Sequence, residues 1–482
     1  MFSLILKTAF LTAIFGLVTR YVMLWLKTKG EITWHEYGIG MAIITIALAP
    51  LTAWIGWKLA ISNNVTFNQY LNGYEQNVTW ERITCHRDGA CRYDYQCDPY
   101  HVPVPYDCNC DSKGKNCSTC WRDEIHYHQC PYVTEEWTFT VRTTLGEYDI
   151  AEHVFPDHPN QHRWRAYESV PDYVIQQAGT GIPPFWTQAK ARLDAGRPGP
   201  VTKRGSYPNY ILASDLTILK QYSSAIDRLK KQRLLPDIST GVHSYYLAEK
   251  VHFIGYQSDQ NETWQKTLMY LNEEIGPKLF GDLHLVIVGD QSVNDNPDEY
   301  SQALKAYWQN RHIWGENALM KNAIVVVIGT RDGKTISWTR AFTGMPLGNE
   351  TMIEDLNAVH SGTLTPEFLL GTLPENLQID PSKKPFIGVN DSGFIKRTIF
   401  GLDRSDATFH RVSMGGHSPT GGIGPGYLYL KNELRPNPSQ ENWILFFGIL
   451  FSSIIWVIAA FLDFDPKRIR NSARMYGYQN FS

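Results

Sequence analysis

All eight cysteines of the chain lie between Cys85 and Cys130, and this cluster has the clearest potential for chemistry. An even number of cysteines in a segment with few core-forming residues is typical of a disulfide-stabilised module. We therefore predict four disulfides, although eight cysteines allow 105 pairings and the spacing does not select one. The cysteines are Cys85, Cys91, Cys97, Cys108, Cys110, Cys117, Cys120 and Cys130.

Two other uses of these cysteines stay open on the sequence alone. Cys117 and Cys120 have the spacing of a zinc knuckle, but a second pair at the matching distance is missing. A redox role for the same two residues would need a thioredoxin-like strand–helix–strand pattern around them, and the sequence lacks that pattern.

A second group of possible ligands lies in the polar segment Gln291–Glu299, which follows a buried apolar run. Asn294, Asp295 and Asp298 offer side-chain oxygens, which are the ligands that calcium prefers. The segment lacks the central glycine and the terminal glutamate of an EF-hand loop. It therefore indicates either a calcium site or a capped, solvated loop.

Six asparagines occur in N-x-Ser/Thr sequences, which are acceptors of N-linked glycans in eukaryotic secreted proteins. In a chain from another kind of organism the same triplets would carry no such meaning. The six are Asn64, Asn77, Asn116, Asn261, Asn349 and Asn390.

Three apolar segments have the length of a membrane-spanning helix. Trp443–Leu462 is uncharged, and Gly38–Ile61 contains one lysine near its end. Leu4–Leu26 is interrupted by Lys7 and Arg20 and could be a signal peptide or an interfacial helix. No small-residue cleavage site follows it, so we predict an uncleaved span.

Basic residues set the orientation of these spans, because cytoplasmic loops are enriched in Lys and Arg. Lys27 and Lys29 lie between the first two spans, and a basic cluster at residues 467–474 follows the last one. We expect an integral membrane protein whose C-terminal tail is cytoplasmic. The bulk of the chain would be extracytoplasmic, whether extracellular, lumenal or periplasmic, which agrees with disulfide formation.

The second half of the chain alternates apolar runs with amphipathic helices. Leu283–Val288 and Ala323–Ile328 are predicted to be buried strands, with the helix Pro297–Trp308 between them. Lys250–Tyr256 is predicted to be a strand, and Glu262–Ile275 a helix that ends at Gly276-Pro277. Such alternation is typical of an α/β sheet that helices cover on both faces.

The first half of the external body shows weaker periodicity. Glu136–Thr143 alternates and is predicted to be a strand, and Ser214–Leu235 is predicted to be a helix that begins with a cap. Residues 144–210 are expected to be irregular, and Arg197–Tyr210 is expected to be a linker or an extended connection.

These observations divide the chain into seven parts. They are two membrane helices in 1–62 (4–26 and 38–61), a cysteine-rich disulfide module at 63–140, a loop-rich region ending in a helix at 141–240, an α/β domain at 241–415, a Gly/Pro-rich connector at 416–441, a membrane helix at 442–462 and a basic tail at 463–482.

The order of elements over Leu283–Pro346 resembles the TPM-domain family, named for thylakoid-lumen, photosystem-repair and receptor-modulator members. Shared features are an apolar strand, an acidic loop, a helix with small and aromatic residues, and a second apolar strand that leads into a hairpin. The resemblance could extend over residues 241–415. The family's Asn-Gly pair is Asn322-Ala323 here, and its Gly-x-Gly is replaced by Thr343-Gly344-Met345.

The resemblance implies a TPM-like α/β sandwich and two possible functions. Most members are membrane-anchored accessory factors of larger complexes, whereas some are acid phosphatases and some bind calcium. By position, Asp290, Asp295 and Asp298 would be the counterparts of the acidic loop and possible calcium ligands.

Composition and the missing motifs favour the first function. The net charge of -3 gives no basic excess for nucleic acid. The sequence contains no complete catalytic set. We therefore expect a membrane-anchored accessory or scaffold protein that makes protein contacts, in an oligomer or a larger membrane complex. The alternative is a TPM-type metal-assisted phosphatase or hydrolase on the external face.

Overall fold

The computed structural model describes most of the chain. The described residues are 2–25, 34–111, 117–133, 135–154, 172–179, 181–214, 221–243, 246–247, 249–345, 347–380, 382, 385–414, 427, 430 and 433–461. The basic residues at 27–29 and 467–474, the residues 415–426 of the connector and Asn116 lie outside them.

Three helices are long and apolar enough to cross a membrane. The first is α1 (Phe2–Trp25). The second is continuous from α2 (Trp34–Ile43) through the π-helical turn η1 (Ile44–Leu48) into α3 (Ala49–Val65). The third is α16 (Pro438–Phe461). The three predicted spans therefore form helices, and they fit a membrane protein.

Small residues let the apolar helices approach closely. A Cβ atom at Gly40 would lie 2.2 Å from the Trp456 ring, and one at Gly56 would lie 2.9 Å from Ile444. Close packing of this kind holds helices together where lipid removes the hydrophobic driving force. At the body end, the amides of Asn64 and Gln440 exchange hydrogen bonds of 2.9 and 2.8 Å, which ties α3 to α16.

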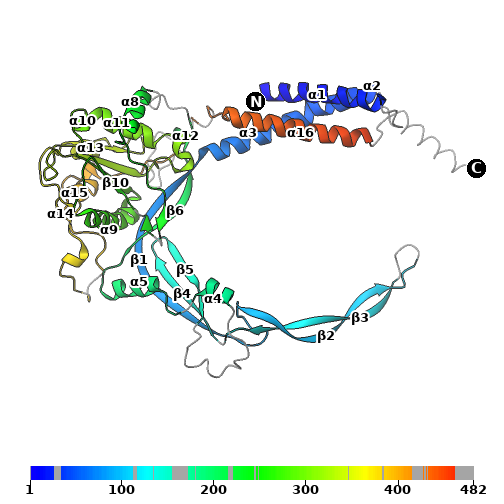
Figure 1. The fold of residues 1–482 in the computed structure, drawn as a ribbon, viewed down its shortest axis with the longest axis horizontal. Coiled ribbons are helices and arrows are strands. Elements are labelled where there is room, and N and C mark those ends of the chain that lie inside the picture. The colour runs from blue at the N-terminus through cyan, green and yellow to red at the C-terminus, as the bar shows by residue number, and fades with distance from the viewer. Residues whose placement is uncertain are drawn as a thin grey trace, which may run out of the picture.

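Strand β1 (Thr66–Thr84) continues directly from α3 and belongs to an antiparallel sheet of order β5-β4-β1-β6. Its first half pairs with β6 (Pro200–Pro208), and its second half pairs with β4 (Glu135–Thr143). The β5 strand (Gly146–Val154) forms the outer edge beyond β4. One strand thus carries the chain from the membrane helices to the far end of the body, as Figure 1 shows.

Two sequence expectations for this region were wrong. Arg197–Tyr210 was expected to be a linker or an extended connection between elements but contains β6, a strand of the sheet that pairs with β1 from Tyr74 to Thr66. Residues 144–210 were expected to be irregular but include β5, α4 (Asp172–Ala178) and α5 (Pro184–Asp194). Prolines at both ends of β6 are typical of a loop, so the sequence did not indicate a strand here. In addition, β6 is stabilised by hydrogen bonds to β1, which is distant in the sequence and leaves no local pattern.

The second sheet has the order β12-β11-β10-β9 and matches the predicted α/β pattern. Strands β9 (Val251–Ile254), β10 (Asp282–Val288) and β11 (Ala323–Gly329) are parallel. Strand β12 (Trp338–Thr343) is antiparallel to β11. The predicted helix at Pro297–Trp308 is α11.

Helix α9 (Asn261–Leu279) runs past the predicted stop at Gly276-Pro277 and ends at Phe280, which adopts a left-handed conformation. Pro277 lies in the last turn of the helix, where its missing N–H removes one intrahelical hydrogen bond, but the helix continues to Leu279. The prediction of a helix end at Gly276 was therefore wrong.

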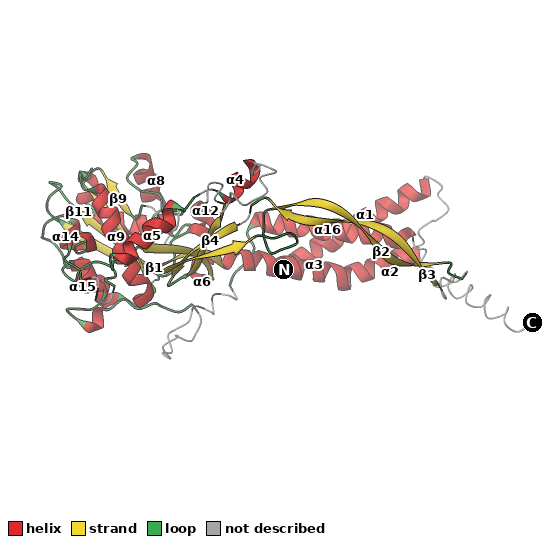
Figure 2. Cartoon of the chain, turned by 90° about the horizontal axis from the view of Figure 1, so that it is seen from below, coloured by secondary structure: helices red, strands yellow, loops and turns green. Residues whose placement is uncertain are grey.

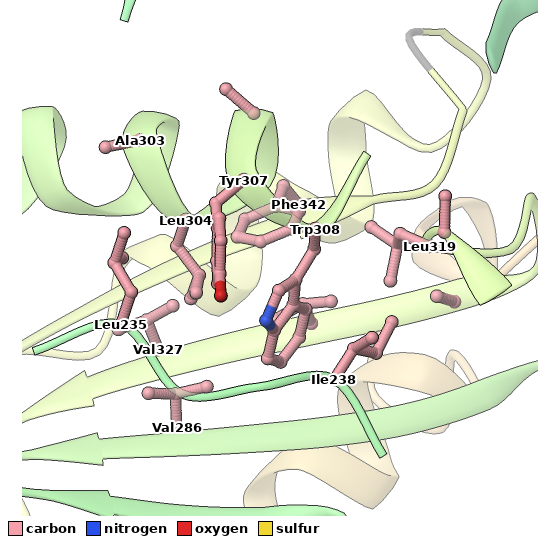
Figure 3. Packing of buried hydrophobic residues seen from close by; sticks show 14 of the residues in the cluster. Leu235, Ile238, Val286, Ala303, Leu304, Tyr307, Trp308, Leu319, Val327 and Phe342 are labelled. Atoms are coloured by element: carbon pink, nitrogen blue, oxygen red, sulfur yellow. The ribbon is translucent and has the colours of Figure 1, made fainter. Parts of the chain in front are cut away.

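Alternate residues of the central strands enter two different cores. On β10, Val286 and Val288 join the core under α11, whereas Leu285 and Ile287 join the core under α9. Figure 3 shows the first of these, in which Trp308 and Leu304 of α11 lie over Val286 and Val327. Burial on both faces is why these strands read as continuous apolar runs.

The remaining elements are short. They are α6 (Tyr210–Ala213), α8 (Ser223–Lys231), β7 (Val242–His243), β8 (Tyr246–Leu247), α10 (Gln291–Asn294), α12 (Arg311–Trp314), η3 (Gly315–Asn317), α13 (Glu350–Asn357), α14 (Pro366–Leu369), η4 (Pro374–Asn376), α15 (Phe394–Ile399) and η5 (Ser405–Ala407). Of the helix predicted at Ser214–Leu235, the structure shows α8, and residues 215–220 lie outside the described ones. The predicted bounds were wrong, because Ser214 ends α6 and residues 232–235 follow the end of α8.

The packing of α9 on β1 predicts an unusual response to a glycine substitution. Gly276→Ala should destabilise the protein by about 1–3 kcal/mol, because the new Cβ would lie 2.1 Å from the backbone oxygen of Asn72. Alanine in an ordinary helix interior would instead stabilise by about 0.5–1 kcal/mol. Gly205→Ala is the control, since the nearest atoms to its Cβ lie 3.7 Å away. Thermal unfolding in detergent measures both, and a raised midpoint for Gly276→Ala would contradict this account.

Candidate functional site

A two-stranded ribbon projects from the body and contains most of the cysteines. Strands β2 (Asp94–Cys108) and β3 (Ser118–Pro131) pair from the base, where Asp94 faces Pro131, to Cys108 opposite Ser118. They pair with no strand of either large sheet. In both views the ribbon extends in the same general direction as the membrane helices (Figures 1 and 2). In Figure 1 it leaves the body at the opposite end from the helices, which gives the molecule a C shape.

All eight cysteines are paired, which supports the predicted disulfides. The pairs Cys97–Cys130, Cys108–Cys120 and Cys110–Cys117 are nested along the ribbon, and Cys85–Cys91 closes a loop at its base. A zinc knuckle would need the thiolates of Cys117 and Cys120, and both residues are disulfide-bonded here. They are paired with Cys110 and Cys108 and not with each other, so they do not form the disulfide of a C-x-x-C redox motif. The disulfides instead stabilise a ribbon that has no core of its own, since an isolated two-stranded hairpin is only marginally stable.

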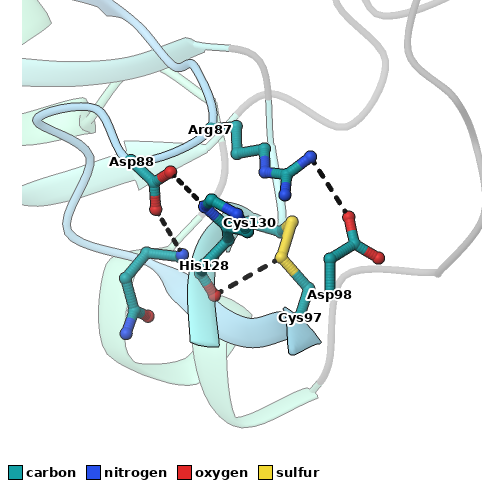
Figure 4. The surroundings of a disulfide bond; sticks show 7 residues. Arg87, Asp88, Cys97, Asp98, His128 and Cys130 are labelled. Carbon is teal, nitrogen blue, oxygen red and sulfur yellow. Dashed lines mark hydrogen bonds and ion pairs between the residues drawn. A yellow bond between two sulfur atoms is a disulfide. The ribbon is translucent and has the colours of Figure 1, made fainter. Parts of the chain in front are cut away.

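Polar contacts fix the base of the ribbon to the antiparallel sheet. The buried carboxylate of Glu136 on β4 accepts hydrogen bonds from the backbone N–H groups of Arg92 and Tyr93, at 2.8 Å for Tyr93. Asp88 accepts from the backbone N–H of Gln129 at 2.8 Å and contacts His128 at 2.5 Å (Figure 4). The direction of the ribbon is therefore set by specific bonds at its base.

The two faces of the ribbon differ in character. One face carries prolines and large apolar side chains, and Trp121, Ile125 and Tyr127 on it are 64%, 56% and 47% exposed. We call it the proline–aromatic face. From the strand register and the alternation of side chains, its members are Pro99, His101, Pro103, Pro105, Trp121, Asp123, Ile125 and Tyr127.

The opposite face satisfies its polar groups within the ribbon, and we call it the charged face. Arg122 forms an ion pair with Glu124 at 2.6 Å, and its guanidinium lies over the Tyr106 ring. The ring of Tyr100 contacts those of His126 and His128. No comparable ion pair or ring contact involves Trp121 or Tyr127 among the described residues, so the proline–aromatic face is the one without partners.

The free edges of the ribbon also differ. Pro99, Pro103 and Pro105 lie at alternate positions of β2, and proline has no N–H to donate. In a continuous antiparallel ladder they are tolerated only where the nitrogen faces away from the partner strand. The free edge of β2 therefore lacks three donors, which blocks the addition of another strand there.

A buried polar network joins the two sheets of the body. Asp282 on β10 receives hydrogen bonds from Asn72 on β1 at 2.6 Å and from His284 at 2.8 Å, and it also forms an ion pair with Lys250. Thr202 on β6 donates to Asn72 at 3.0 Å. All five residues are buried. The polar letters at positions 282 and 284, in the otherwise apolar run DLHLVIV, were the only sequence signal of this network.

The ionisation of the network follows from these contacts. Burial raises the pKa of Asp282, but the Lys250 charge, the His284 charge and hydrogen bonds from both outweigh it and hold that pKa at about 2. Burial lowers the pKa of Lys250, and Asp282 opposes that effect. We take the pair as ionised, because Asp282 accepts from three donors. A charged pair at this depth does not contact solvent. It contributes to the specificity and the stability of the fold.

The acidic loop lies at the carboxyl edge of the parallel strands, after β10. Each predicted ligand already has a structural partner. Asp290 caps α10 by accepting from the backbone N–H of Ser292 at 2.9 Å, and Asp295 accepts from the Gln291 amide at 2.7 Å. Asp298 pairs with Arg340 at 2.5 Å, which lowers the pKa of that carboxyl.

These three aspartates do not form a compact ligand group. Among the described residues, two groups of three His, Cys, Asp or Glu ligand atoms lie within 4.8 Å of one another, and both contain disulfide-bonded cysteines. Calcium binding by Asp290, Asp295 and Asp298 therefore stays a prediction.

The predicted glycan acceptors occupy different surroundings. Asn77 and Asn261 are exposed. Asn349 is only 6% exposed, and its amide donates to the His410 carbonyl and accepts from the His410 N–H. Asn64 is engaged with Gln440. Asn390 is partly buried and accepts from Thr372. A glycan would be attached to the Asn349 amide nitrogen, which is buried here and donates to the His410 carbonyl.

A pocket of about 590 Å³ lies between α5, α9 and the turn at Pro374. Arg192 and Lys266 line it, but each already pairs with a carboxylate, Glu75 and Glu375 respectively. Arg197 also lines the pocket, and it donates to the Leu377 carbonyl at 3.3 Å but has no carboxylate partner among the described residues. The lining therefore keeps one guanidinium without an ion pair.

The comparisons with known proteins do not indicate a family or a function for this chain. The chain matches no family model, no curated protein and no solved structure. The resemblance to the TPM-domain family thus remains a prediction.

The network predicts a large effect for the removal of one buried charge. Lys250→Met should destabilise the protein by about 3–5 kcal/mol, because it removes the lysine charge that pairs with the buried Asp282 carboxylate. Adding Asp282→Asn should recover part of that loss, because it removes the unpaired buried charge and keeps a side-chain oxygen that can accept from Asn72. Lys190→Met removes the exposed pair with Asp194 and should change stability by less than about 0.5 kcal/mol. Chemical unfolding in detergent checks all three, and equal effects for both lysines would contradict the assignment.

A buried histidine predicts the sign of a pH effect. Burial, and to a smaller extent the nearby His284, lower the pKa of His252 to about 4 from its ordinary 6.5. Below pH 6.5 the unfolded chain takes up a proton that the folded chain does not, so stability should fall as pH drops toward 4, by at most about 1.4 kcal/mol per pH unit. His252→Leu should flatten this slope, whereas His101→Leu on the exposed ribbon should not. Parallel curves for the wild type and His252→Leu would refute the prediction.

Proposed function

We propose that this chain is a membrane-anchored accessory or scaffold protein that makes protein–protein contacts through its disulfide-bonded ribbon. The body and the base of the ribbon lie on the extracytoplasmic side, and the C-terminal tail lies in the cytoplasm. The observation that carries the proposal is the ribbon itself, whose two faces and two edges lie against no other sheet.

The direction of the ribbon supports an assembly rather than an isolated chain. It extends alongside the membrane helices in both views, so its outer part lies at the level of the spans (Figures 1 and 2). A single ribbon has open edges, and this one carries Asp107, Arg122 and Asp123 on its outer part. Unpaired backbone groups and charges are excluded from lipid. Protein from other chains would therefore have to surround the ribbon at this level.

The composition of the proline–aromatic face supports the same function. Exposed aromatic side chains are enriched at protein contacts, because they bury a large area at a low entropic cost. Covalent cross-links at intervals along the ribbon keep it in one conformation, which reduces the entropy lost on binding.

The alternative is a metal-assisted phosphatase or hydrolase of TPM type. It is favoured by the position of the acidic loop, because α/β sheets bind ligands at the carboxyl ends of their parallel strands. In that case Asp290, Asp295 and Asp298 would hold calcium. The present partners of these residues, which include Arg340, would have to be displaced.

Shortening the ribbon tests the first proposal directly. Residues 103–123 can be replaced by Asn-Gly, which joins Val102 to Glu124, its partner in the register, through a tight hairpin turn. This deletion removes two whole disulfides and keeps the other two, so it leaves no free cysteine. We expect a folded, membrane-inserted chain that loses its oligomeric mass or its co-purifying partners, as measured by light scattering in mild detergent.

The control for this experiment is a full-length ribbon that carries Tyr106→Ala on the charged face. It should keep the mass of the wild type. A shortened chain with unchanged mass and partners would reject the ribbon as the contact site. Hydrolysis of phosphate esters that requires both Asp295 and Asp298 would favour the alternative function.

A further inference from the structure

We infer that the proline–aromatic face of the ribbon is a contact surface for a second copy of this chain, with the two ribbons packed face to face about a two-fold axis that runs along them. This inference rests on the proposed function and names the partner of the ribbon.

The membrane restricts the symmetry of any such pair. Two copies anchored in one bilayer with the same orientation can be related only by an axis along the membrane normal. The membrane helices mark that direction, and the ribbon extends along it in both views (Figures 1 and 2). A two-fold axis parallel to the ribbons brings identical faces together and keeps both copies upright.

Two ribbons cannot pair edge to edge, because either the prolines or the membrane orientation prevents it. Addition of one copy's β3 to the next copy's β2 would need donors that Pro99, Pro103 and Pro105 lack. Antiparallel pairing of the two β3 edges would need a two-fold axis perpendicular to the ribbon. That axis would direct the membrane helices of the two copies to opposite sides. Face packing is the arrangement that both the prolines and the membrane allow.

The register of the ribbon makes this face complementary to itself. A two-fold axis along the ribbon places β2 of one copy over β3 of the other at the same level. Pro105 lies opposite Trp121 within one ribbon, so Trp121 would pack on Pro105 of the second copy. In the same way Tyr127 would meet Pro99 of the second copy. Proline rings and aromatic rings pack without leaving donors unsatisfied.

The two polar members of the face are also complementary across this axis. Asp123 is opposite Pro103, and His101 lies two residues from Pro103 on the same face. Asp123 of one copy would therefore lie beside His101 of the second copy. Neither side chain has a hydrogen bond or an ion pair among the described residues, whereas the charged face pairs Arg122 with Glu124 internally.

The area of this contact limits its strength. The stretch from Pro99 to Pro105 is about 23 Å long and two strands wide, or roughly 10 Å. This is smaller than the roughly 800 Å² that each partner buries in a standard interface. Anchorage of both copies in one membrane raises their effective concentration, which is how a small contact can be occupied.

Site-specific photo-crosslinking in native membranes tests the inference with the full chain. Benzoylphenylalanine is placed at position 121 on the proline–aromatic face or, as a matched control, at position 106 on the charged face. We expect a covalent dimer from position 121, with the link mapped by mass spectrometry to the peptide that contains Pro103 and Pro105. Position 106 should give little dimer. Equal dimer from both positions, or a link from position 121 to a different protein, would overturn the inference.

A second measurement separates this inference from the proposed function. Trp121→Ser combined with Ile125→Ser should weaken self-association by about tenfold or more, measured by energy transfer between labelled copies in vesicles. Tyr106→Ser should leave it unchanged. Undiminished association of the double variant would reject the face contact but keep the scaffold proposal. A wild-type chain that is monomeric and free of partners would reject both.

Discussion

The structure depends on one buried residue, Asn72, where strand β1 crosses the α/β sheet. Its amide donates to Asp282, its side-chain oxygen accepts from Thr202 and Lys250, and its backbone oxygen lies against Gly276 of α9. Because these groups are buried, each must be satisfied, and only one placement of the two sheets satisfies them together. The ion pair of Lys250 with Asp282 then makes any other placement costly, since it would leave a charge unpaired in the interior.

This constraint determines how the two ends of the molecule are related. Strand β1 begins where α3 ends and continues to Thr84, just before the loop closed by Cys85 and Cys91. The strand is thus a direct link between the membrane helices and the base of the ribbon. At that base Glu136 and Asp88 bind backbone N–H groups, so the ribbon direction follows from the sheet. The C shape in Figure 1 is the outcome of a continuous strand that is fixed at its middle.

The aspartates of the acidic loop serve the fold. Asp290 caps a helix turn, Asp295 binds Gln291, and Asp298 pairs with Arg340. The ribbon differs from this loop, because one of its faces has no partners. Its charged face is satisfied internally, and its proline–aromatic face is exposed although such side chains are costly to leave in water. This exposed face, on a ribbon held by three disulfides, is the feature on which the proposed contact function rests.

The sequence by itself determined the elements whose signals are local. The apolar lengths predicted the membrane helices, the continuous runs predicted β10 and β11, and the cysteine count predicted disulfides. Their boundaries came out within a few residues, because periodicity and burial act over one element. The tertiary structure alone decided the rest. The strand β6, the pairing of the cysteines and the network around Asn72 all join residues that lie far apart along the chain. No local pattern encodes which distant partner will satisfy a strand edge or a buried charge, since that choice is made only when the sheets pack together.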